Sequence, residues 1–375
     1  MQMKGIFIYY NKINKNSLSG IDKKVLTQIQ AFNNKKLNCN MVVLNEKEGK
    51  QNKLINALLI RLPFSNKTPR WSYVQEFDDI DFLYFRRPFF LSIHTIKVLK
   101  DIRKRNPGIK VILEIPNYPY DSEIKRNRKN LPLYIKDKYN RRKLRDVVDR
   151  IAVQNDIENI FDIPTLKFVN GIDVSQVSLR KPKTNSIDTI NICAVASLTP
   201  WQGYERIING LNQYYKNGGT RKIIIHVVGE GIERKYYEEL VNKFNLIENV
   251  IFYGFLTGKE IDEVYNISDL ALDAFGRYKT NNKLSTSLKS REYLAKGLPI
   301  ILGCETDIIN SDFTYSIRYP NDDSIVDFNH IVDFYDRIYK KEDDKLEVSR
   351  EIRNYAYNVC DISKTMGDII NYIKS

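Results

Sequence analysis

Long apolar runs and closely spaced cysteines are missing from this 375-residue sequence, and each absence excludes a class of protein. No run approaches the roughly 18 consecutive apolar residues of a membrane-spanning helix. The sequence opens MQMKGIFIYY, a short apolar strand followed by polar residues, which does not fit a signal peptide. We therefore expect a cytoplasmic protein. The four cysteines show no C-x-x-C spacing, so we expect reduced, buried thiols and no zinc site or disulfide framework.

Apolar and positively charged residues are plentiful. Hydrophobic residues make up 42% of the sequence and charged residues 28%, which is far from the composition of a disordered chain. At about 150 residues per domain, the length predicts two domains. The 59 Lys and Arg exceed the 46 Asp and Glu and give a net charge of +13. That excess favours an anionic partner, which can be nucleic acid, a membrane surface or a phosphorylated substrate.

The first half of the chain alternates apolar strands with helical stretches. Ile21, Val25, Ile29 and Phe32 recur at the spacing of one helix face, and Asn106-Pro107-Gly108 marks the end of a later helix. Such alternation predicts an α/β domain with a doubly wound parallel sheet. The expected strands cover residues 4–10, 40–44, 81–85, 110–115, 150–153 and 166–169, with a helix over 90–105.

The alternation pauses over residues 174–189, which we predict to be a linker, and then restarts. We expect a first domain over 1–173, a second doubly wound domain over 190–357, and a C-terminal helix, at about 358–375, that crosses back to the first domain. Ligands bind beside the carboxyl ends of the strands in such sheets. The expected strands of the second domain cover residues 190–196, 223–228, 250–253, 270–275 and 299–302.

Four segments, taken in order, carry a family resemblance. They read VNGID at 169–173, AVASLTPWQG at 194–203, VGEG at 228–231 followed by NVIFYGF at 249–255, and SLKSREYLAKGLPI at 287–300. Together they resemble the family 4 glycosyltransferases, retaining enzymes of the GT-B fold that use nucleotide-sugar donors. Two first-domain segments, residues 19–24 and 114–121, are similar to the branch that builds bacterial surface polysaccharides.

The resemblance implies an enzyme that transfers a sugar from a nucleotide sugar, expected to be a UDP-sugar, to a glycan or lipid-linked acceptor. It implies two Rossmann-like domains facing across a cleft, the first holding the acceptor and the second the donor. Gly20, Asp22 and Tyr118 are the acceptor-side candidates. Neither a metal nor another cofactor is expected, because the D-x-D sequence Asp79-Ile80-Asp81 precedes a strand and is interpreted as a solvated turn.

The segment at 287–300 has a physical logic of its own. A helix that begins near Ser287 and Leu288 offers free backbone N–H groups and the positive end of its dipole to a diphosphate, and Lys289 adds charge there. Glu292, one turn further on, can accept two hydrogen bonds from a ribose diol, a role that the resemblance also implies. The alternative is that Ser287 is only an N-cap and that Glu292 pairs with Lys296 at i, i+4.

Three loops of the second domain supply further donor-binding candidates. Gly203 would let a loop approach the ligand backbone to backbone, or it is simply a turn glycine. Gly229 precedes Gly231 without the third glycine of a dinucleotide fingerprint, so turn geometry explains it equally well. Phe255 follows the strand where, in the family, the base is held through backbone atoms.

The sequence departs from the family at the positions that usually bind the diphosphate. Ser197 and Gln202 stand where the family commonly has Arg and Lys, and a charge pair at about 4 Å is worth roughly 4 kcal/mol at an effective dielectric near 20. Leu284 stands where the family has the first of two glutamates, so the backbone of 275–278, Asn281 or Asn282 must bind the sugar instead. Substitute cations are available at Lys279, Lys283, Lys289 and Arg291, of which we expect Lys279 and Lys289 to bind the donor.

No general base is evident for the transfer. His94, His226 and His330 lie in helix, strand and tail contexts, and we interpret each as structural. In a retaining transfer the donor phosphate itself can take the acceptor proton, as the resemblance implies. The catalytic candidates are Glu292, Lys289 and, as a fallback base beside Glu123, Asp121.

The positive charge is concentrated in residues 125–146, where ten basic residues and two acids give a net +8. Apolar residues such as Leu131 and Ile135 are interleaved with them, as in a segment that lies on an anionic bilayer. A solvated surface and nucleic-acid binding are the alternatives, although no nucleic-acid motif is present. We expect a peripheral protein on the inner face of the cell membrane, with the bilayer contacted by Arg126, Arg128, Lys129, Arg141 and Arg142.

Two other functions stay open. A non-catalytic partner or chaperone with the same fold would explain the residues found at Ser197, Gln202 and Leu284. A sugar-nucleotide epimerase is disfavoured, because such enzymes use acidic and histidine chemistry that the expected cleft lacks.

Overall fold

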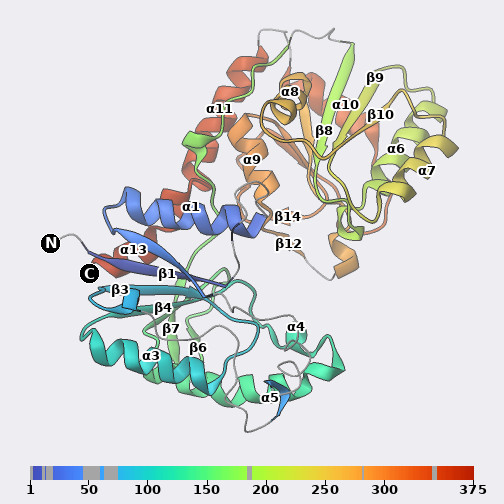
Figure 1. The fold of residues 1–375 in the computed structure, drawn as a ribbon. Helices are drawn as coiled ribbons and strands as arrows, with labels where there is room; N and C mark the ends of the chain where they lie inside the picture. Colours follow the sequence, from blue (N-terminus) through green and yellow to red (C-terminus); the bar gives the residue numbers. More distant parts are fainter. Residues whose placement is uncertain are drawn as a thin grey trace. The chain divides into compact units, whose positions relative to one another are not determined.

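The computed structural model describes residues 3–10, 13, 20–44, 60–62, 75–183, 188–280, 283–339 and 344–375. Ser19, Asn281 and Asn282 lie outside the described residues. The chain divides into two compact units. Unit 1 comprises Met1–Asn170 and Thr365–Ser375, and unit 2 comprises Gly171–Lys364. Each unit is a doubly wound α/β structure, as predicted (Figure 1).

Unit 1 contains, among its described residues, a seven-stranded sheet in the order β2-β1-β3-β4-β5-β7-β6. Every strand pair is parallel except β6 with β7. Figure 1 shows α1 and α13 on one face of this sheet and α3 on the other. The strands are β1 (Gly5–Tyr9), β2 (Cys39–Val43), β3 (Phe82–Arg86), β4 (Lys110–Ile115), β5 (Arg150–Val153), β6 (Asn159–Ile160) and β7 (Ile163–Lys167). The helices are α1 (Gly20–Asn34), α3 (Ile93–Arg105), α4 (Asp121–Lys125), α5 (Leu131–Asn140) and α13 (Gly367–Lys374).

The central strands of unit 1, β1, β3, β4 and β5, are buried on both faces, which is why they read as continuous apolar runs. All five residues of β1 are buried. In α1, Val25 and Phe32 face the core as predicted, whereas Ile21 is 50% exposed because it lies in the first turn of the helix. The last unit 1 strand before the boundary is β7, which spans Ile163–Lys167 and not the expected 166–169.

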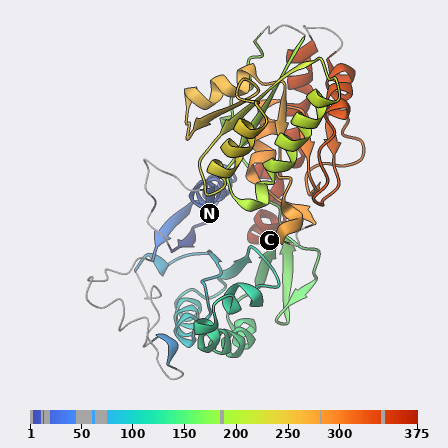
Figure 2. The same cartoon turned by 90° about the vertical axis from the view of Figure 1, so that its right-hand side faces the viewer.

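Unit 2 contains, among its described residues, a six-stranded parallel sheet in the order β10-β9-β8-β11-β13-β15 and a small pair of strands, β12 and β14. Helices α6 and α7 lie on one side of the large sheet and α8, α9 and α11 on the other (Figure 1 and Figure 2). The strands are β8 (Thr189–Val195), β9 (Lys222–Val228), β10 (Val250–Gly254), β11 (Leu270–Leu272), β12 (Leu284–Ser285), β13 (Ile300–Leu302), β14 (Glu305–Thr306) and β15 (Ser316–Arg318). The helices are α6 (Tyr204–Lys216), α7 (Arg234–Lys243), α8 (Lys259–Ile267), α9 (Leu288–Lys296), α10 (Phe328–Ile338) and α11 (Asp344–Val359), and α12 (Ile362–Thr365) ends at the first residue of the segment that returns to unit 1.

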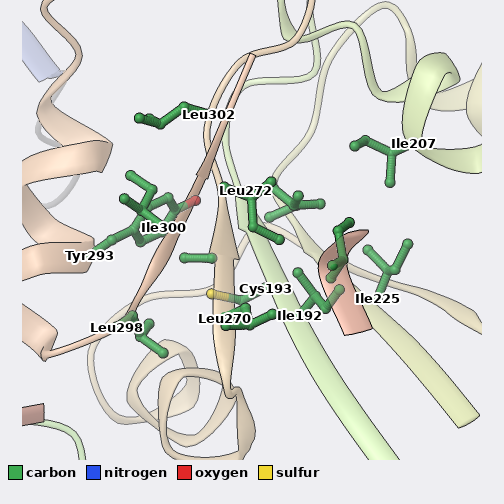
Figure 3. Close-up of a cluster of buried hydrophobic side chains, with 14 of the residues drawn as sticks. Ile192, Cys193, Ile207, Ile225, Leu270, Leu272, Tyr293, Leu298, Ile300 and Leu302 are labelled. Atoms are coloured by element: carbon green, nitrogen blue, oxygen red, sulfur yellow. The ribbon is translucent and has the colours of Figure 1, made fainter. Parts of the chain in front are cut away.

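The core of unit 2 is centred on β8, β11 and β13 (Figure 3). Ile192, Leu270 and Ile300 come from these three adjacent strands and are fully buried. Tyr293 reaches this core from α9. Its hydroxyl accepts a hydrogen bond from the Val195 backbone N at 2.8 Å and contacts the Val195 O at 3.2 Å. The side chain therefore holds α9 against the carboxyl end of β8.

The expected linker is partly wrong. Val174 and Arg180 are almost completely buried in unit 2, and the Arg180 guanidinium hydrogen-bonds to Ser349 Oγ at 2.8 Å and to Tyr339 OH at 3.0 Å. Residues 174–183 thus pack as part of unit 2, because a buried arginine needs these partners. The boundary falls at residue 170 and not 173, and the returning segment starts at Thr365 and not near 358. Of the helices built from described residues, none has the length and apolarity of a membrane span.

Candidate active site

The candidate site lies at the carboxyl ends of β8 and β11 in unit 2. These strands are hydrogen-bonded neighbours, although β9 and β10 separate them in the sequence, so the winding of the sheet reverses between them. Open α/β sheets bind their ligands at such a switch point. Here the connection after β8 supplies Gln202, the connection after β11 supplies Asp273, and α9 begins nearby at its N-cap, Ser287.

Asp273 is the buried centre of this site. Its side chain is fully buried and accepts hydrogen bonds from the hydroxyls of Ser290 at 2.9 Å and of Ser285 and Ser287 at 3.3 Å each. Burial alone raises the pKa of Asp273, but the Lys289 ammonium, the Ser290 hydroxyl and the Arg277 guanidinium outweigh it, so the net pKa is lowered. Asp273 is not among the residues predicted from the sequence. Its signal is an acidic residue placed directly after the buried strand Leu270–Leu272.

Lys289 is already partnered within the protein. Its Nζ donates to Gln202 Oε1 at 2.7 Å and to Tyr204 OH at 3.3 Å, and it lies 3.3 Å from Asp273 Oδ1. Burial lowers the pKa of Lys289, and the opposing effect of Asp273 does not cancel the shift. Two predicted donor-binding residues, Lys289 and Gln202, are thus brought together. However, the lysine charge is offset by a carboxylate, which corrects the expectation of a free substitute cation.

Two other expected cations also form protein contacts. Lys279 Nζ lies 2.5 Å from Oε1 of Glu205, in the first turn of α6. Arg291 is fully buried and pairs with Asp307 at 2.5 Å while donating to the Ser287 backbone O at 2.8 Å. Arg291 therefore fixes the start of α9 and does not face a ligand.

Arg277 is a further cation near the site and is not among those predicted from the sequence. It begins the short 3₁₀ helix Arg277–Thr280 after β11, and its charge acts on both Asp273 and Lys289. Its Nε is buried without a hydrogen-bond partner. Within the described part of the chain, no carboxylate lies at ion-pair distance from its guanidinium. The sequence predicts a role for the backbone of residues 275–278 only. The sequence signal for Arg277 is its place in the loop that follows β11, one of the two strands at the switch point.

The start of α9 has the predicted geometry. Ser287 is its N-cap, and its Oγ accepts a hydrogen bond from Ser290 N at 3.4 Å, so Leu288 is the first helical residue. Half-buried Glu292 accepts a hydrogen bond from Tyr265 OH at 3.1 Å. Lys296 instead pairs with Asp262 at 2.6 Å, so the alternative of a Glu292 and Lys296 pair is wrong. Glu292 keeps acceptor sites for a ligand.

The loop glycines pack against other loops of unit 2. Gly203 has a φ of +65°, and a Cβ there would collide with the Gly276 N. Gly229 has a φ of +127°, and a Cβ there would collide with the Ala196 O. Both positions need glycine for this close approach within the protein. Ser197 is exposed in the loop after β8, and Phe255 is 75% exposed beyond β10.

A cavity of about 470 Å³ lies at the carboxyl ends of β11, β13 and β15. Its volume falls in the range of small-ligand sites, about 300–1,000 Å³. Cys304 lines it, and burial raises the pKa of this thiol to about 11, which makes it a poor nucleophile. The other lining residues are Tyr278, Lys283, Glu305, Arg318, Tyr319, Pro320 and Asn321.

In unit 1, the two segments similar to the polysaccharide branch meet. Lys24 Nζ lies 3.0 Å from Oε1 of the fully buried Glu114, and Arg86 Nε lies 3.2 Å from the same oxygen. Asp22 is 8% exposed and accepts a hydrogen bond from Tyr9 OH at 2.5 Å. Gly20 begins α1. These contacts place the acceptor-side candidates Asp22 and Gly20 on the helix that the Glu114 cluster holds to the sheet.

Both fallback bases are ion-paired. Asp121 pairs with Arg141 at 2.7 Å and accepts a hydrogen bond from Tyr134 OH at 3.0 Å. The hydrogen bond from Arg141 lowers the pKa of Asp121, which works against a role as general base. Glu123 pairs with Arg87 at 2.6 Å. The described residues contain no cluster of three or more histidine, cysteine or acidic side chains arranged to hold a metal ion.

Four of the five expected membrane-facing cations are exposed, namely Arg126, Arg128, Lys129 and Arg142. Arg141 contradicts the expectation. Its side chain is only 11% exposed, because it packs between the Asp121 carboxylate and the Phe161 ring, whose centroid is 5.1 Å away.

Residues 178–305 match the family described as Glycosyl transferases group 1. No curated protein matches the chain. Among solved structures, Anabaena Alr3699/HepE in complex with UDP-glucose is 12% identical, with a TM-score of 0.56 over 99% of both chains. Sucrose-phosphate synthase from Thermosynechococcus elongatus is 13% identical, with a TM-score of 0.59 over 99% of both chains. The lipopolysaccharide outer core galactosyltransferase WaaB is 13% identical, with a TM-score of 0.58 over 100% of both chains.

At these identities the solved structures show the fold, which is GT-B. The family match covers β8 to β14, the part of unit 2 that contains Asp273, Arg277 and the start of α9. Residues 178–305 are therefore similar to the Glycosyl transferases group 1 family, and the whole chain has the GT-B fold.

Proposed function

We propose that this enzyme transfers a sugar from a UDP-sugar, with retention, to a glycan or lipid-linked acceptor during bacterial surface-polysaccharide synthesis. The assignment of the donor site is supported by two side chains at the switch point that can still form hydrogen bonds with a ligand. Among the described residues, the Arg277 guanidinium has no carboxylate partner, and Glu292 accepts a hydrogen bond from one side chain, Tyr265. HepE, which has the same fold, is known in complexes with UDP and UDP-glucose, and this supports the choice of base.

Each of these groups fits one part of the donor. The diphosphate would receive charge-assisted hydrogen bonds from Arg277 and from the backbone N–H groups at the start of α9. The Glu292 carboxylate would accept from the two ribose hydroxyls. Lys289 and Asp273 would hold the loops on which these groups stand, because their mutual contacts join α9, β11 and the connection after β8.

The same groups account for the departure of the leaving nucleotide. Negative charge develops on the diphosphate as the bond to the sugar breaks, and a guanidinium and a helix N-terminus fixed beforehand stabilise it without reorganising. Asp121 and Glu123 are neutralised by arginines, so we assign the acceptor proton to the departing phosphate on the same face of the sugar.

Calorimetric titration of UDP into wild-type enzyme and into Glu292→Gln tests the donor site. We expect at least tenfold weaker binding by the variant with unchanged unfolding, since Glu292 is half-buried and Tyr265 retains an amide oxygen as partner. Glu238→Gln, on α7, is the matched control. Equal affinity of Glu292→Gln and wild type would refute the ribose assignment. Failure of the wild type to bind UDP, GDP or ADP would favour the non-catalytic partner.

A cytoplasmic position on the inner membrane face is the second part of the proposal. Helix α5 exposes Leu131, Ile135 and Tyr139 by 53%, 60% and 62%, at i, i+4 and i+8 along one stripe. The stripe is accompanied by the exposed cations Arg128, Lys129, Lys138 and Arg142. Apolar residues that enter the headgroup region beside cations fit an anionic bilayer. At about 1 kcal/mol per basic residue near the surface, four cations give roughly 4 kcal/mol, enough for reversible docking.

A further inference from the structure

A second cavity, of about 460 Å³, lies within unit 1. Its walls come from three parts of the chain: the connection between β4 and α4, the end of α5 with the 3₁₀ helix Arg141–Asp146 that follows it, and the turn between β6 and β7. The volume is again that of a small-ligand site. The donor residues all belong to unit 2, and none of them lines this cavity.

The lining carries an excess of positive charge. Lys138, Arg141, Arg142 and Arg145 face two carboxylates, Asp121 and Asp162, so the four cations and two anions leave a net +2. Arg141 is neutralised by Asp121 at 2.7 Å, and Arg145 lies 3.7 Å from Asp162. The remaining two cations therefore carry the excess.

Lys138 and Arg142 are the cations available to a ligand. Within the described part of the chain, neither has a carboxylate within 4.0 Å. They are four residues apart, where α5 passes into the 3₁₀ helix, so they occupy the same side of this segment. An arginine and a lysine presented side by side suit a phosphate group, the arginine as a bidentate donor and the lysine as a point charge.

Two further residues of the lining are aromatic. The rings of Tyr118 and Phe161 meet edge to face with centroids 6.0 Å apart. Phe161 and Asp162 both have positive φ, 56° and 63°, a tight turn that carries the Phe161 ring into the cavity wall. A rigid aromatic wall offers an apolar surface to the carbon face of a sugar ring.

We propose that this cavity binds a sugar phosphate of the acceptor, with the phosphate held by Lys138 and Arg142 and the sugar ring packed on Tyr118 and Phe161. The designation as acceptor rests on the proposed glycosyl transfer, whereas the binding of a sugar phosphate does not. A phospholipid headgroup shares the phosphate but lacks a sugar ring for the aromatic wall.

The test is a titration of glucose 1-phosphate into full-length enzyme in the presence of saturating UDP, which occupies the donor site. We expect saturable binding, at least tenfold weaker in Lys138→Ala/Arg142→Ala and unchanged in the control Lys97→Ala/Lys100→Ala. All four side chains are exposed, and Lys97 and Lys100 lie on α3, so neither double variant should change the stability of the fold. Glucose and inorganic phosphate, as halves of the ligand, should each bind more weakly than glucose 1-phosphate.

Three results would overturn the cavity assignment: no binding of glucose 1-phosphate, equal affinity in the wild type and Lys138→Ala/Arg142→Ala, or phosphate binding as tightly as glucose 1-phosphate. An effect of the double variant confined to anionic vesicles would also overturn it in favour of a lipid headgroup. UDP titration alone separates the two proposals. Loss of UDP binding with glucose 1-phosphate binding intact refutes the donor proposal and leaves the cavity assignment standing.

Discussion

Lys289 Nζ lies 3.3 Å from Asp273 Oδ1, and the two side chains are 13% and 0% exposed. The lysine that the family resemblance directs toward the donor is therefore also the counter-ion of a buried carboxylate. Because Asp273 follows β11 and Lys289 stands in the first turn of α9, the pair joins the two elements between which the donor would bind.

Lys289→Met should destabilise unit 2 strongly. Removing one partner of a buried ion pair leaves the other charge uncompensated, which costs about 3–5 kcal/mol. Urea unfolding followed by circular dichroism measures the change. The double variant Lys289→Met/Asp273→Asn should recover part of the loss, because no buried charge is left. A single variant as stable as wild type would mean that the serine hydroxyls around Asp273 suffice to hold its charge.

Arg277→Gln should weaken UDP binding and leave stability almost unchanged, since its Nε has no hydrogen-bond partner to lose. Hydrogen bonds to a charged group are worth about 1.5–3 kcal/mol, or roughly ten- to a hundredfold in Kd. Calorimetry with UDP measures the affinity. Lys279→Ala is the comparison, because its ammonium is held by Glu205 at 2.5 Å, and less than threefold loss is expected. The reverse order of effects would assign the diphosphate to Lys279.

Stability should fall between pH 7 and pH 5 because of His226. Burial lowers the pKa of His226 from its ordinary 6.5 to about 4. As the pH falls, His226 is protonated in the unfolded chain before it is protonated in the folded one. The stability that neutral His226 contributes is therefore complete above pH 6.5 and is lost as the pH approaches 4. The expected loss from pH 7 to pH 5 is about 2 kcal/mol.

Urea unfolding at both pH values, with wild type and His226→Gln, measures this effect. The glutamine does not titrate, so its pH dependence should be smaller by about 2 kcal/mol. Glu114 does not interfere. Burial raises the pKa of Glu114, but the Lys24 and Arg86 cations lower it further, to about 2. The stability that Glu114 contributes is therefore lost only as the pH falls below the ordinary pKa of 4.5. Identical pH profiles of the two proteins would remove His226 as the cause.

Membrane docking should depend on the exposed stripe of α5. In vesicle flotation, the wild type should bind vesicles with anionic lipid and not neutral ones, because four cations accompany the stripe. Ile135→Ser/Tyr139→Ser should reduce binding at least tenfold, because tenfold corresponds to about 1.4 kcal/mol and the burial of one apolar side chain contributes about 1.5–3 kcal/mol. Ile232→Ser in unit 2, where the side chain is 79% exposed, is the control. Equal binding of neutral and anionic vesicles would exclude this surface.

The two doubly wound sheets and the start of α9 can be predicted from the sequence alone. Residues 110–115 and 150–153 were predicted as strands with their observed bounds, because strands buried on both faces are continuous apolar runs. The N-cap at Ser287 could be predicted because capping depends on neighbours three residues away.

Which charged side chains form ion pairs depends on the tertiary packing. Lys279 pairs with Glu205, 74 residues away, and Lys296 with Asp262 on another helix. Asp273 lies at the centre of the site, and Arg277 has no carboxylate partner among the described residues. Local patterns specify periodicity and caps, whereas an ion pair needs two atoms within 4 Å, which only the packing of distant elements can arrange.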